Sequence, residues 1–243
     1  MRLSRVHVDF ELHTGARVTV EGNAGNHIVR VLRLRTGDTL TLFNGRGGEF
    51  GGSITEIRRD AVAIAVGERR QVERESPLRL TLAQGISRGE RMDWVVQKAT
   101  ELGVARIVPI FTERSVVQLD EKQASRKVQH WSSIAIAACE QSGRNQVPEI
   151  AAPVDLYRWL EQRPRNGMDL LLSPEATARV TDMAVSGQQA TVLIGPEGGL
   201  ADVEQETALR SGFKSVRMGP RILRTETAAV CALTLLQQTF GDL

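Results

Sequence analysis

The sequence predicts an α/β protein in which a small β-rich domain is followed by a larger domain of alternating strands and helices. Residues 1–72 read as short strands separated by turn signals, whereas strands alternate with longer helices after Pro77. A chain of 243 residues with 41% hydrophobic content can bury two unequal cores. We therefore expect a small β-barrel at 1–72, a linker at 73–77 and an α/β domain with a mainly parallel sheet at 78–243.

The strands of the first domain are predicted from hydrophobic alternation. Segments 17–21 and 39–43 alternate between polar and apolar residues, and 61–66 is an apolar run. Asn44-Gly45 is a strong hairpin signal, because both residue types tolerate a positive φ. Between the strands, segment 26–34 is expected to form a short helix with three side chains facing inward: Ile28, Val31 and Leu32.

Arginine supplies all the positive charge of this first domain. Its eleven basic residues are all arginines, against eight acidic residues. Guanidinium groups bind phosphate through two parallel hydrogen bonds, so exposed arginines are candidates for contacts to a nucleic-acid backbone. The candidates are Arg30, Arg33, Arg35 and Arg46. An ordinary solvated surface in an arginine-rich chain explains the same residues equally well.

The second domain is expected to contain five strands and four helices. The strands are predicted at 78–83, 106–110, 168–172, 191–194 and 214–218. The helices are predicted before Gly103, at 121–142, at 201–211 and at 226–240. Ser87 and Glu90 have the spacing of a capping box in front of the first helix, and Thr225 is a credible N-cap for the last.

A glycine-bearing loop follows the strand that ends near Ile194. The segment Ile194–Gly199 lacks the spacing of a phosphate-binding loop, and its only charged residue is Glu197. That carboxylate would repel a pyrophosphate but tolerate a cationic ligand that contains adenine, such as the sulfonium of S-adenosylmethionine. A helix N-terminus with Glu197 near the positive end of its dipole is the alternative interpretation.

A second segment of similar form, Met218–Ala228, places Arg221 and Arg224 between a short strand and a buried helix. Two arginines at the mouth of a buried helix are easier to explain as phosphate or carboxylate ligands than as packing. The alternative is that they neutralise Glu197, Glu226 or loop carbonyl groups.

These two segments, with 98–104 and 138–144, closely resemble the ribosomal RNA small subunit methyltransferase E family of the SPOUT superfamily. The order of the four motifs agrees, and residues 27–34 with Gly37-Asp38 resemble the small PUA-like RNA-binding domain of that family. The likeness therefore extends over nearly the whole chain.

The resemblance implies methyl transfer from S-adenosyl-L-methionine to N3 of one uridine in the decoding region of 16S ribosomal RNA, within the small ribosomal subunit. It also implies a SPOUT α/β trefoil-knot domain near the C-terminus and a homodimer. By similarity, the cofactor would be bound by Leu193, Ile194, Gly195, Pro196, Gly198, Gly199, Met218, Gly219, Ile222, Leu223, Thr225 and Ala228.

Methylation at N3 requires removal of the uracil proton and stabilisation of the resulting anion. Arg144, Arg221 and Arg224 are the candidates for stabilising that charge or gripping flanking phosphates. Glu197 and Glu226 are candidate general bases, and the sequence does not choose between them. A non-catalytic RNA-binding or ribosome-assembly protein, and a methyltransferase for another RNA position, remain alternatives.

Composition excludes several other classes. The chain has no apolar run long enough for a membrane span and no signal-peptide pattern, so a cytoplasmic protein is expected. Cys139 and Cys231 lie in alanine-rich helical segments and are expected to be separate reduced thiols. The four histidines lack metal-ligand spacing, so no metal is expected.

Overall fold

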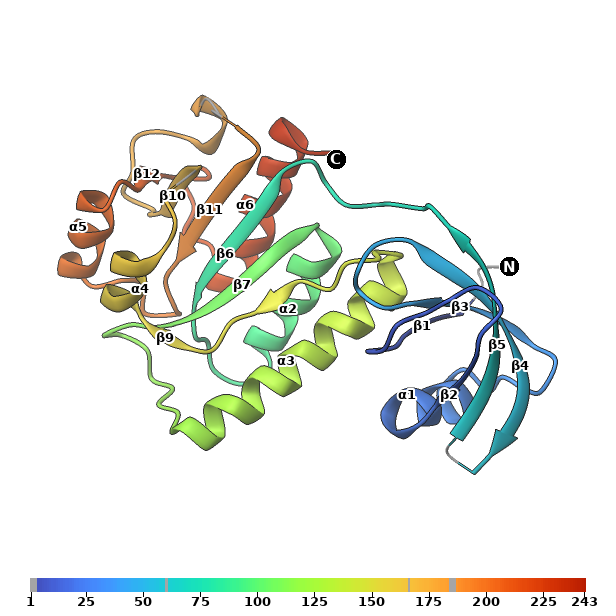
Figure 1. Ribbon diagram of the computed structural model, residues 1–243. Helices are drawn as coiled ribbons and strands as arrows, with labels where there is room; N and C mark the ends of the chain where they lie inside the picture. Colours follow the sequence, from blue (N-terminus) through green and yellow to red (C-terminus); the bar gives the residue numbers. More distant parts are fainter. Residues whose placement is uncertain (1–3, 60, 166, 184–186) are drawn as a thin grey trace. The chain divides into compact units, whose positions relative to one another are not determined.

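The computed structural model describes residues 4–59, 61–165, 167–183 and 187–243, and the chain divides into two compact units (Figure 1). The smaller unit comprises the chain up to Glu75 together with Cys139–Val147, and the larger unit comprises Ser76–Ala138 and Pro148–Leu243. The second segment of the smaller unit includes the end of a long helix. Local sequence patterns gave no sign of this inclusion.

The smaller unit is built on a five-stranded sheet. Its strands are β1 (Arg5–His7), β2 (Arg17–Val20), β3 (Thr39–Phe43), β4 (Glu49–Arg58) and β5 (Ala61–Arg70), in the order β1-β3-β4-β5-β2. Strand β1 pairs parallel with β3, and the other pairs are antiparallel. The turn signal at Asn44-Gly45 does join two antiparallel strands, although β4 begins only at Glu49.

The single short helix expected at 26–34 is instead two turns of different type. The helix α1 (Gly22–Asn26) is followed by the π-helix η1 (His27–Val31), in which the N–H of Leu32 donates to the carbonyl of His27. A π-turn contains more residues than an α-turn and rotates the side chains that follow. Ile28 is therefore buried, but Val31 is 66% exposed, which contradicts its predicted inward orientation.

The larger unit contains a seven-stranded, wholly parallel sheet. Its strands are β6 (Arg79–Gly85), β7 (Val104–Phe111), β8 (Glu149–Ile150), β9 (Val154–Asp155), β10 (Met168–Leu172), β11 (Gln189–Ile194) and β12 (Lys214–Val216). The order is β12-β10-β11-β6-β7-β8, and β9 also pairs with β7. The parallel sheet predicted from alternating strands and helices is thus confirmed.

Helices cover both faces of this sheet. They are α2 (Arg91–Glu101), α3 (Glu121–Ser142), α4 (Leu156–Gln162), α5 (Asp202–Arg210) and α6 (Thr225–Phe240). Leu171 and Leu193 share a core with α4 and α5, which lie together in Figure 1. Because side chains alternate along a strand, Leu170 and Val192 face the opposite side, where α6 packs against α2 and the sheet.

Two predicted helix caps are wrong. Thr225 is the first residue of α6, and Arg224 occupies the N-cap position without a capping side-chain hydrogen bond. The hydroxyl of Thr225 is used elsewhere, as described below. Ser87 and Glu90 form no capping box either, since α2 begins at Arg91 and Glu90 makes no cap bond with its side chain. Tertiary contacts have taken precedence over local cap signals at both helices.

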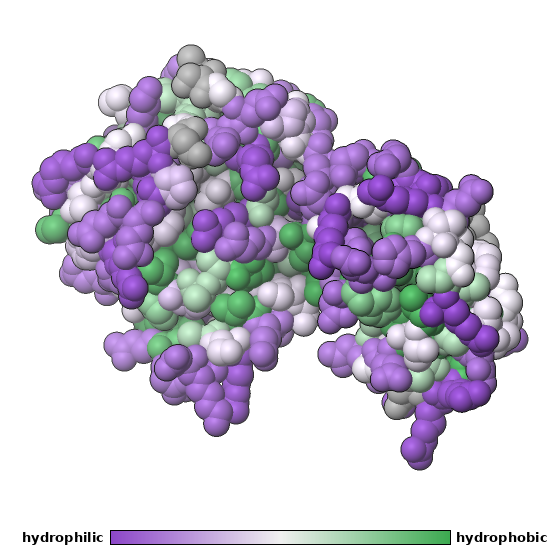
Figure 2. Space-filling model, in the orientation of Figure 1, coloured by the Kyte–Doolittle hydropathy of each residue, from purple (hydrophilic) through white to green (hydrophobic). Residues whose placement is uncertain are grey.

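None of the helices within the described ranges is long and apolar enough to cross a membrane. Figure 2 shows that hydrophilic side chains dominate the periphery of the larger unit, while apolar side chains gather on the visible face near β7 and β9. Long α3 has few fully buried apolar side chains, chiefly Trp131, Ala135 and Ala138.

Candidate functional site

A pocket of about 550 Å³ lies at the carboxyl edge of three neighbouring strands of the larger unit. Strands β10, β11 and β12 end at Leu172, Ile194 and Val216, and each leads directly into residues that line the pocket. Open parallel sheets bind ligands at this edge. The lining residues are Arg91, Arg114, Leu172, Ser173, Pro174, Glu175, Ile194–Leu200, Gln205, Arg217, Met218, Arg221–Glu226 and Ala228.

The loop after β11 is folded back tightly on itself. The N–H of Gly199 donates to the carbonyl of Pro196 at 2.9 Å, and Gly199 has a φ of +70°. A Cβ atom on Gly195 would lie 2.8 Å from the carbonyl carbon of Gly199, and one on Gly85 would lie 2.4 Å from the nitrogen of Pro196. Glycine is therefore required at 195 and 85, because a larger residue would push the loop off β6.

The start of α6 holds this loop from the other side. The Thr225 hydroxyl donates to the carbonyl of Gly195 at 2.7 Å and accepts a hydrogen bond from Nε2 of Gln84 at 2.8 Å. Gln84 is fully buried in β6, and Thr225 is 7% exposed. The Thr225 hydroxyl thus joins two segments that lie thirty residues apart in sequence. Because its hydroxyl makes these contacts, Thr225 lies within the helix and does not cap it.

The carboxylate of Glu197 is already occupied by partners from the chain around α2. It accepts hydrogen bonds from the N–H of Arg88 at 3.0 Å and from Nη1 of Arg91 at 2.6 Å. Burial acts to raise the pKa of Glu197, but these hydrogen bonds outweigh it and hold the pKa below its usual value. Glu197 is therefore a carboxylate in a formed ion pair, which is a poor arrangement for a general base.

The carboxylate of Glu226 differs from that of Glu197. Glu226 lies in the first turn of α6, its side chain is 16% exposed, and its Oε1 is 4.0 Å from Nε of Arg91. Its Oε2 is buried and has no hydrogen-bond partner among the described residues. Of the three glutamates that line the pocket, Glu226 is the one with a buried carboxylate oxygen that lacks a partner among the described residues, whereas Glu175 is exposed.

Guanidinium groups dominate the charge of the pocket. Five arginines line it: Arg91, Arg114, Arg217, Arg221 and Arg224. Arg114 donates to the carbonyl of Gly198 at 3.2 Å and so holds the outer side of the loop. The side chains of Arg221 and Arg224 are exposed and make no hydrogen bond or ion pair to any residue that the structure describes. They are available to an anionic ligand.

Most of the residues predicted for this site do come together. Ten of the twelve cofactor candidates line the pocket, as do Arg221, Arg224 and Glu197. Leu193 is instead fully buried in the sheet core beneath the loop, and Gly219 is not a lining residue although its φ of +123° shapes the turn after β12. The sequence analysis missed Arg91, Arg114 and Arg217. Arg217 lay inside the strand predicted at 214–218, and it follows β12 directly because that strand ends at Val216.

Arg144 is not among the residues that line this pocket. Arg144 belongs to the smaller unit, is 4% exposed, and binds Glu75 through both Nε and Nη2. Its carbonyl oxygen and the side chain of Asn145 accept hydrogen bonds from Arg5. Arg144 therefore anchors the end of α3 within the smaller unit. Its guanidinium group is engaged in a buried ion pair and is not available to a substrate.

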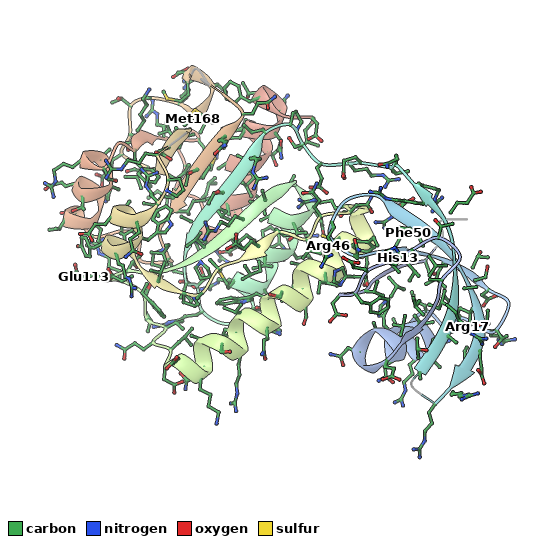
Figure 3. The ribbon with its side chains drawn as sticks, viewed as in Figure 1. His13, Arg17, Arg46, Phe50, Glu113 and Met168 are labelled. Carbon is green, nitrogen blue, oxygen red and sulfur yellow. The ribbon has the colours of Figure 1, made fainter. Side chains whose placement is uncertain are left out.

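The four arginines predicted to contact RNA are all exposed on the smaller unit. Arg30, Arg33 and Arg35 lie in or just after η1, and Arg33 has a positive φ of 54°. Arg46 lies in the β3–β4 loop, in the same part of the unit as His13 in Figure 3, and it pairs with Glu11 at 3.1 Å. Exposure suits phosphate contacts but does not by itself identify RNA.

Cysteine and metal chemistry play no visible part in the pocket. Cys139 is buried and Cys231 is half-buried, and both are free thiols. Burial raises the pKa of the Cys139 thiol to about 12, so it stays protonated at neutral pH. Within the described ranges, no group of three or more histidine, cysteine, aspartate or glutamate side chains is arranged to hold a metal ion.

Comparison with known proteins agrees with this arrangement. Residues 74–237 match the RNA methyltransferase domain family, and residues 20–66 match the RNA methyltransferase PUA domain family. The chain is 35% identical over 242 residues to the ribosomal RNA small subunit methyltransferase E of Buchnera aphidicola from Schizaphis graminum, covering 100% of this chain and 98% of the relative. It is 33% identical to that of Bacillus subtilis, covering 90% and 88%.

Two solved structures also resemble the chain over its whole length. The ribosomal RNA small subunit methyltransferase E of Neisseria gonorrhoeae bound to S-adenosyl methionine has a TM-score of 0.92 and 34% identity, with 100% of both chains covered. A Legionella pneumophila protein in complex with bound SAM has a TM-score of 0.97 and 42% identity, also with 100% of both chains covered.

The fold and the matched domains define an RNA methyltransferase with an N-terminal PUA domain and a C-terminal parallel-sheet domain. Within that class, the chain belongs to the ribosomal RNA small subunit methyltransferase E family.

Proposed function

We propose that this protein is an enzyme that transfers the methyl group of S-adenosylmethionine to N3 of a uridine in the decoding region of 16S ribosomal RNA. The observation that carries the proposal is the pocket itself. Two glycine-bearing loops, at 194–199 and 217–224, close around it, and the two exposed guanidinium groups of Arg221 and Arg224 stand on its lining.

The pocket suits an adenosyl sulfonium in size and in its apolar contacts. Its volume of about 550 Å³ lies within the range of small-molecule sites. Apolar side chains such as Ile194, Leu200 and Leu223 offer contacts to an adenine ring, and the turn at Pro196–Gly199 exposes backbone groups for hydrogen bonds. The relative from Neisseria gonorrhoeae was solved with this cofactor, which supports the same ligand here.

The chemistry makes use of the arginines. Uracil N3 is a weak nucleophile until it loses its proton, and the ring then carries a negative charge on N3 and its two carbonyl oxygens. Arg221 and Arg224 lack partners within the described chain, so they are free to stabilise this anion or to grip the flanking phosphates. Because N3 is a pairing edge, the target base must be unpaired or flipped out.

The smaller unit is the proposed RNA-binding element. Its match to a PUA domain of RNA methyltransferases supports this assignment, as do the exposed arginines at 30, 33, 35 and 46. We also propose that the protein acts in the cytoplasm as a homodimer with a trefoil knot near its C-terminus. Trp94, a large apolar side chain that is 41% exposed on α2, supports self-association.

Calorimetry with S-adenosylhomocysteine tests the first half of this proposal. We expect saturable binding, whereas no binding at millimolar ligand would favour a non-catalytic RNA-binding or ribosome-assembly protein. Mass spectrometry of nucleosides from small-subunit RNA of a deletion strain tests the second half. Loss of 3-methyluridine from the decoding region is expected, and loss of another modified nucleoside would assign a different RNA position.

A further inference from the structure

The unused oxygen of Glu226 is the most unusual polar atom in the pocket. A buried carboxylate oxygen without a donor is unfavourable, because its desolvation is not compensated. A carboxylate oxygen in this place, in the first turn of α6, can only accept hydrogen bonds. Since Glu226 lines the pocket, a ligand that donates a proton or a hydrogen bond would complete the site.

The neighbouring carboxylate cannot take this role as readily. Oε1 of Glu197 accepts hydrogen bonds from the N–H of Arg88 at 3.0 Å and from the guanidinium of Arg91 at 2.6 Å, and these bonds lower its pKa. A proton on Glu197 would weaken its ion pair with Arg91. Glu226 shares the same arginine only at 4.0 Å and keeps Oε2 free. The geometry thus separates two carboxylates that the sequence treats alike.

The charge around Glu226 indicates which kind of donor fits. Arg91 already lies beside this carboxylate, and Arg221 and Arg224 line the same pocket. The anion that is left when a neutral imide N–H loses its proton would be attracted to these guanidinium groups. Uracil N3–H is such a group.

We infer that Glu226 is the general base that takes the N3 proton of the target uracil, which rests on the proposed function. The N3–H bond breaks, its proton passes to Oε2, and the electron pair stays on N3. N3 then forms a bond to the methyl carbon while the carbon–sulfur bond breaks, and its electron pair returns to sulfur to give a neutral thioether. The protonated Glu226 afterwards releases its proton to solvent, which restores the enzyme.

Arg91 has a defined part in this step as a positioning residue. Before proton transfer it faces two carboxylates, Glu197 at 2.6 Å and Glu226 at 4.0 Å. When Glu226 becomes neutral, Arg91 keeps its closer partner, so its own guanidinium retains a counter-charge. The negative charge moves from Glu226 to the uracil ring, within the same arginine-lined pocket.

The test compares wild type with Glu226→Gln in single-turnover methylation of small-subunit RNA between neutral and alkaline pH, with the product identified as a nucleoside by mass spectrometry. At neutral pH we expect the variant to be slower by about 100-fold or more. Because hydroxide can replace the missing base, the deficit should shrink by roughly tenfold for each unit of pH. Glu226→Asp should restore part of the rate.

Two further measurements complete the design. Binding of S-adenosylhomocysteine to Glu226→Gln should stay within about twofold of wild type, because the cofactor is not the proposed donor. Glu206→Gln is the matched control, since Glu206 lies exposed on α5 and pairs with Arg210 at 3.6 Å. It should match the wild-type rate at every pH.

The contrary results are distinct. A Glu226→Gln variant with the wild-type rate, or with a deficit that is the same at every pH, would overturn the assignment of Glu226 alone. A tenfold or greater loss of S-adenosylhomocysteine affinity would show instead that Glu226 binds the cofactor. A wild-type enzyme that forms no 3-methyluridine would overturn the proposed function, and this inference with it.

Discussion

The hydroxyl of Thr225 donates to the carbonyl oxygen of Gly195 across 2.7 Å, and this contact ties the start of α6 to the turn that follows β11. Because Gln84 in turn donates to the same hydroxyl at 2.8 Å, the turn is held against β6 from beneath. One hydroxyl therefore keeps both cofactor loops at a fixed spacing, although it contributes no charge to the chemistry.

Replacement of this hydroxyl should weaken both the fold and the pocket. In Thr225→Val the Gly195 carbonyl and the Gln84 amide lose a buried partner, which should lower the free energy of unfolding by about 1–2 kcal/mol. S-adenosylhomocysteine affinity should fall as well, as measured by calorimetry. Thr239→Val, on the exposed side of the same helix, is the control. Equal behaviour of the two variants would contradict the role of Thr225.

The turn after β11 should not tolerate a side chain at 195. A Cβ atom there would lie 2.8 Å from the backbone of Gly199, so Gly195→Ala must open the loop. We expect cofactor affinity to drop by about tenfold or more, in line with the 1–3 kcal/mol cost of overpacking. Gly51→Ala, where no atom lies within 4 Å of the added Cβ, should bind as wild type does. Unchanged affinity in Gly195→Ala would mean that the loop is not the binding element.

The ion pair between Arg91 and Glu197 should stabilise the protein only where Glu197 is charged. The pKa of Glu197 is lowered in the folded state, so its stabilisation is present above the ordinary carboxyl value of 4.5 and is lost as pH falls through the lower folded value. The coupling energy between Arg91→Ala and Glu197→Gln, from a double-mutant cycle in urea, should therefore be present at pH 7 and vanish in acid. A coupling that does not change with pH would contradict this account.

Arg144 should behave as an anchor of the smaller unit. Arg144→Ala leaves Glu75, whose side chain is only 15% exposed, without its cation, and should cost about 3–5 kcal/mol of stability. Arg210→Ala removes a surface pair that is more than 60% exposed on each side, and should cost less than about 0.5 kcal/mol. If Arg144→Ala unfolds like wild type yet loses methylation, Arg144 acts in catalysis, as the sequence suggested.

The arginines after η1 should govern RNA affinity through phosphate contacts. The double variant Arg30→Glu/Arg33→Glu should bind small-subunit RNA more weakly and flatten the dependence of log affinity on log salt by roughly 0.7 for each lost contact. Arg210→Glu, on the larger unit, serves as a charge-reversal control away from these arginines in sequence. A wild-type salt slope in the double variant would show that RNA is bound elsewhere.

Elements with a continuous pattern that ends at a clear stop signal were predictable from the sequence. The bounds of α3 at 121–142 and of β10 at 168–172 agree with the predicted ranges, because each is a continuous pattern with a clear stop. The short helix α4 was missed, although Asp155 caps it by accepting hydrogen bonds from the N–H groups of Tyr157 and Arg158. Its apolar residues are too few to show a period.

The functional site was likewise predictable from the sequence only in part. The two glycine-bearing loops were identified locally, since glycine and proline leave a signal in the sequence itself. Arg91 reaches the pocket only because β6 pairs with β11 and carries the start of α2 to the loop at Glu197. The place of Arg144 in the smaller unit was not predictable, because nothing local shows that the end of α3 joins that unit. Both depend on pairings between distant segments, which one sequence does not encode locally.

The most direct test of the central claim is methylation of small-subunit RNA by the purified protein with isotopically labelled S-adenosylmethionine, followed by nucleoside mass spectrometry and mapping of the modified position. The account predicts one labelled 3-methyluridine per RNA, in the decoding region, and its loss in Arg224→Ala without loss of fold. Label on another atom or nucleotide, or no transfer by protein that binds both RNA and S-adenosylhomocysteine, would contradict it.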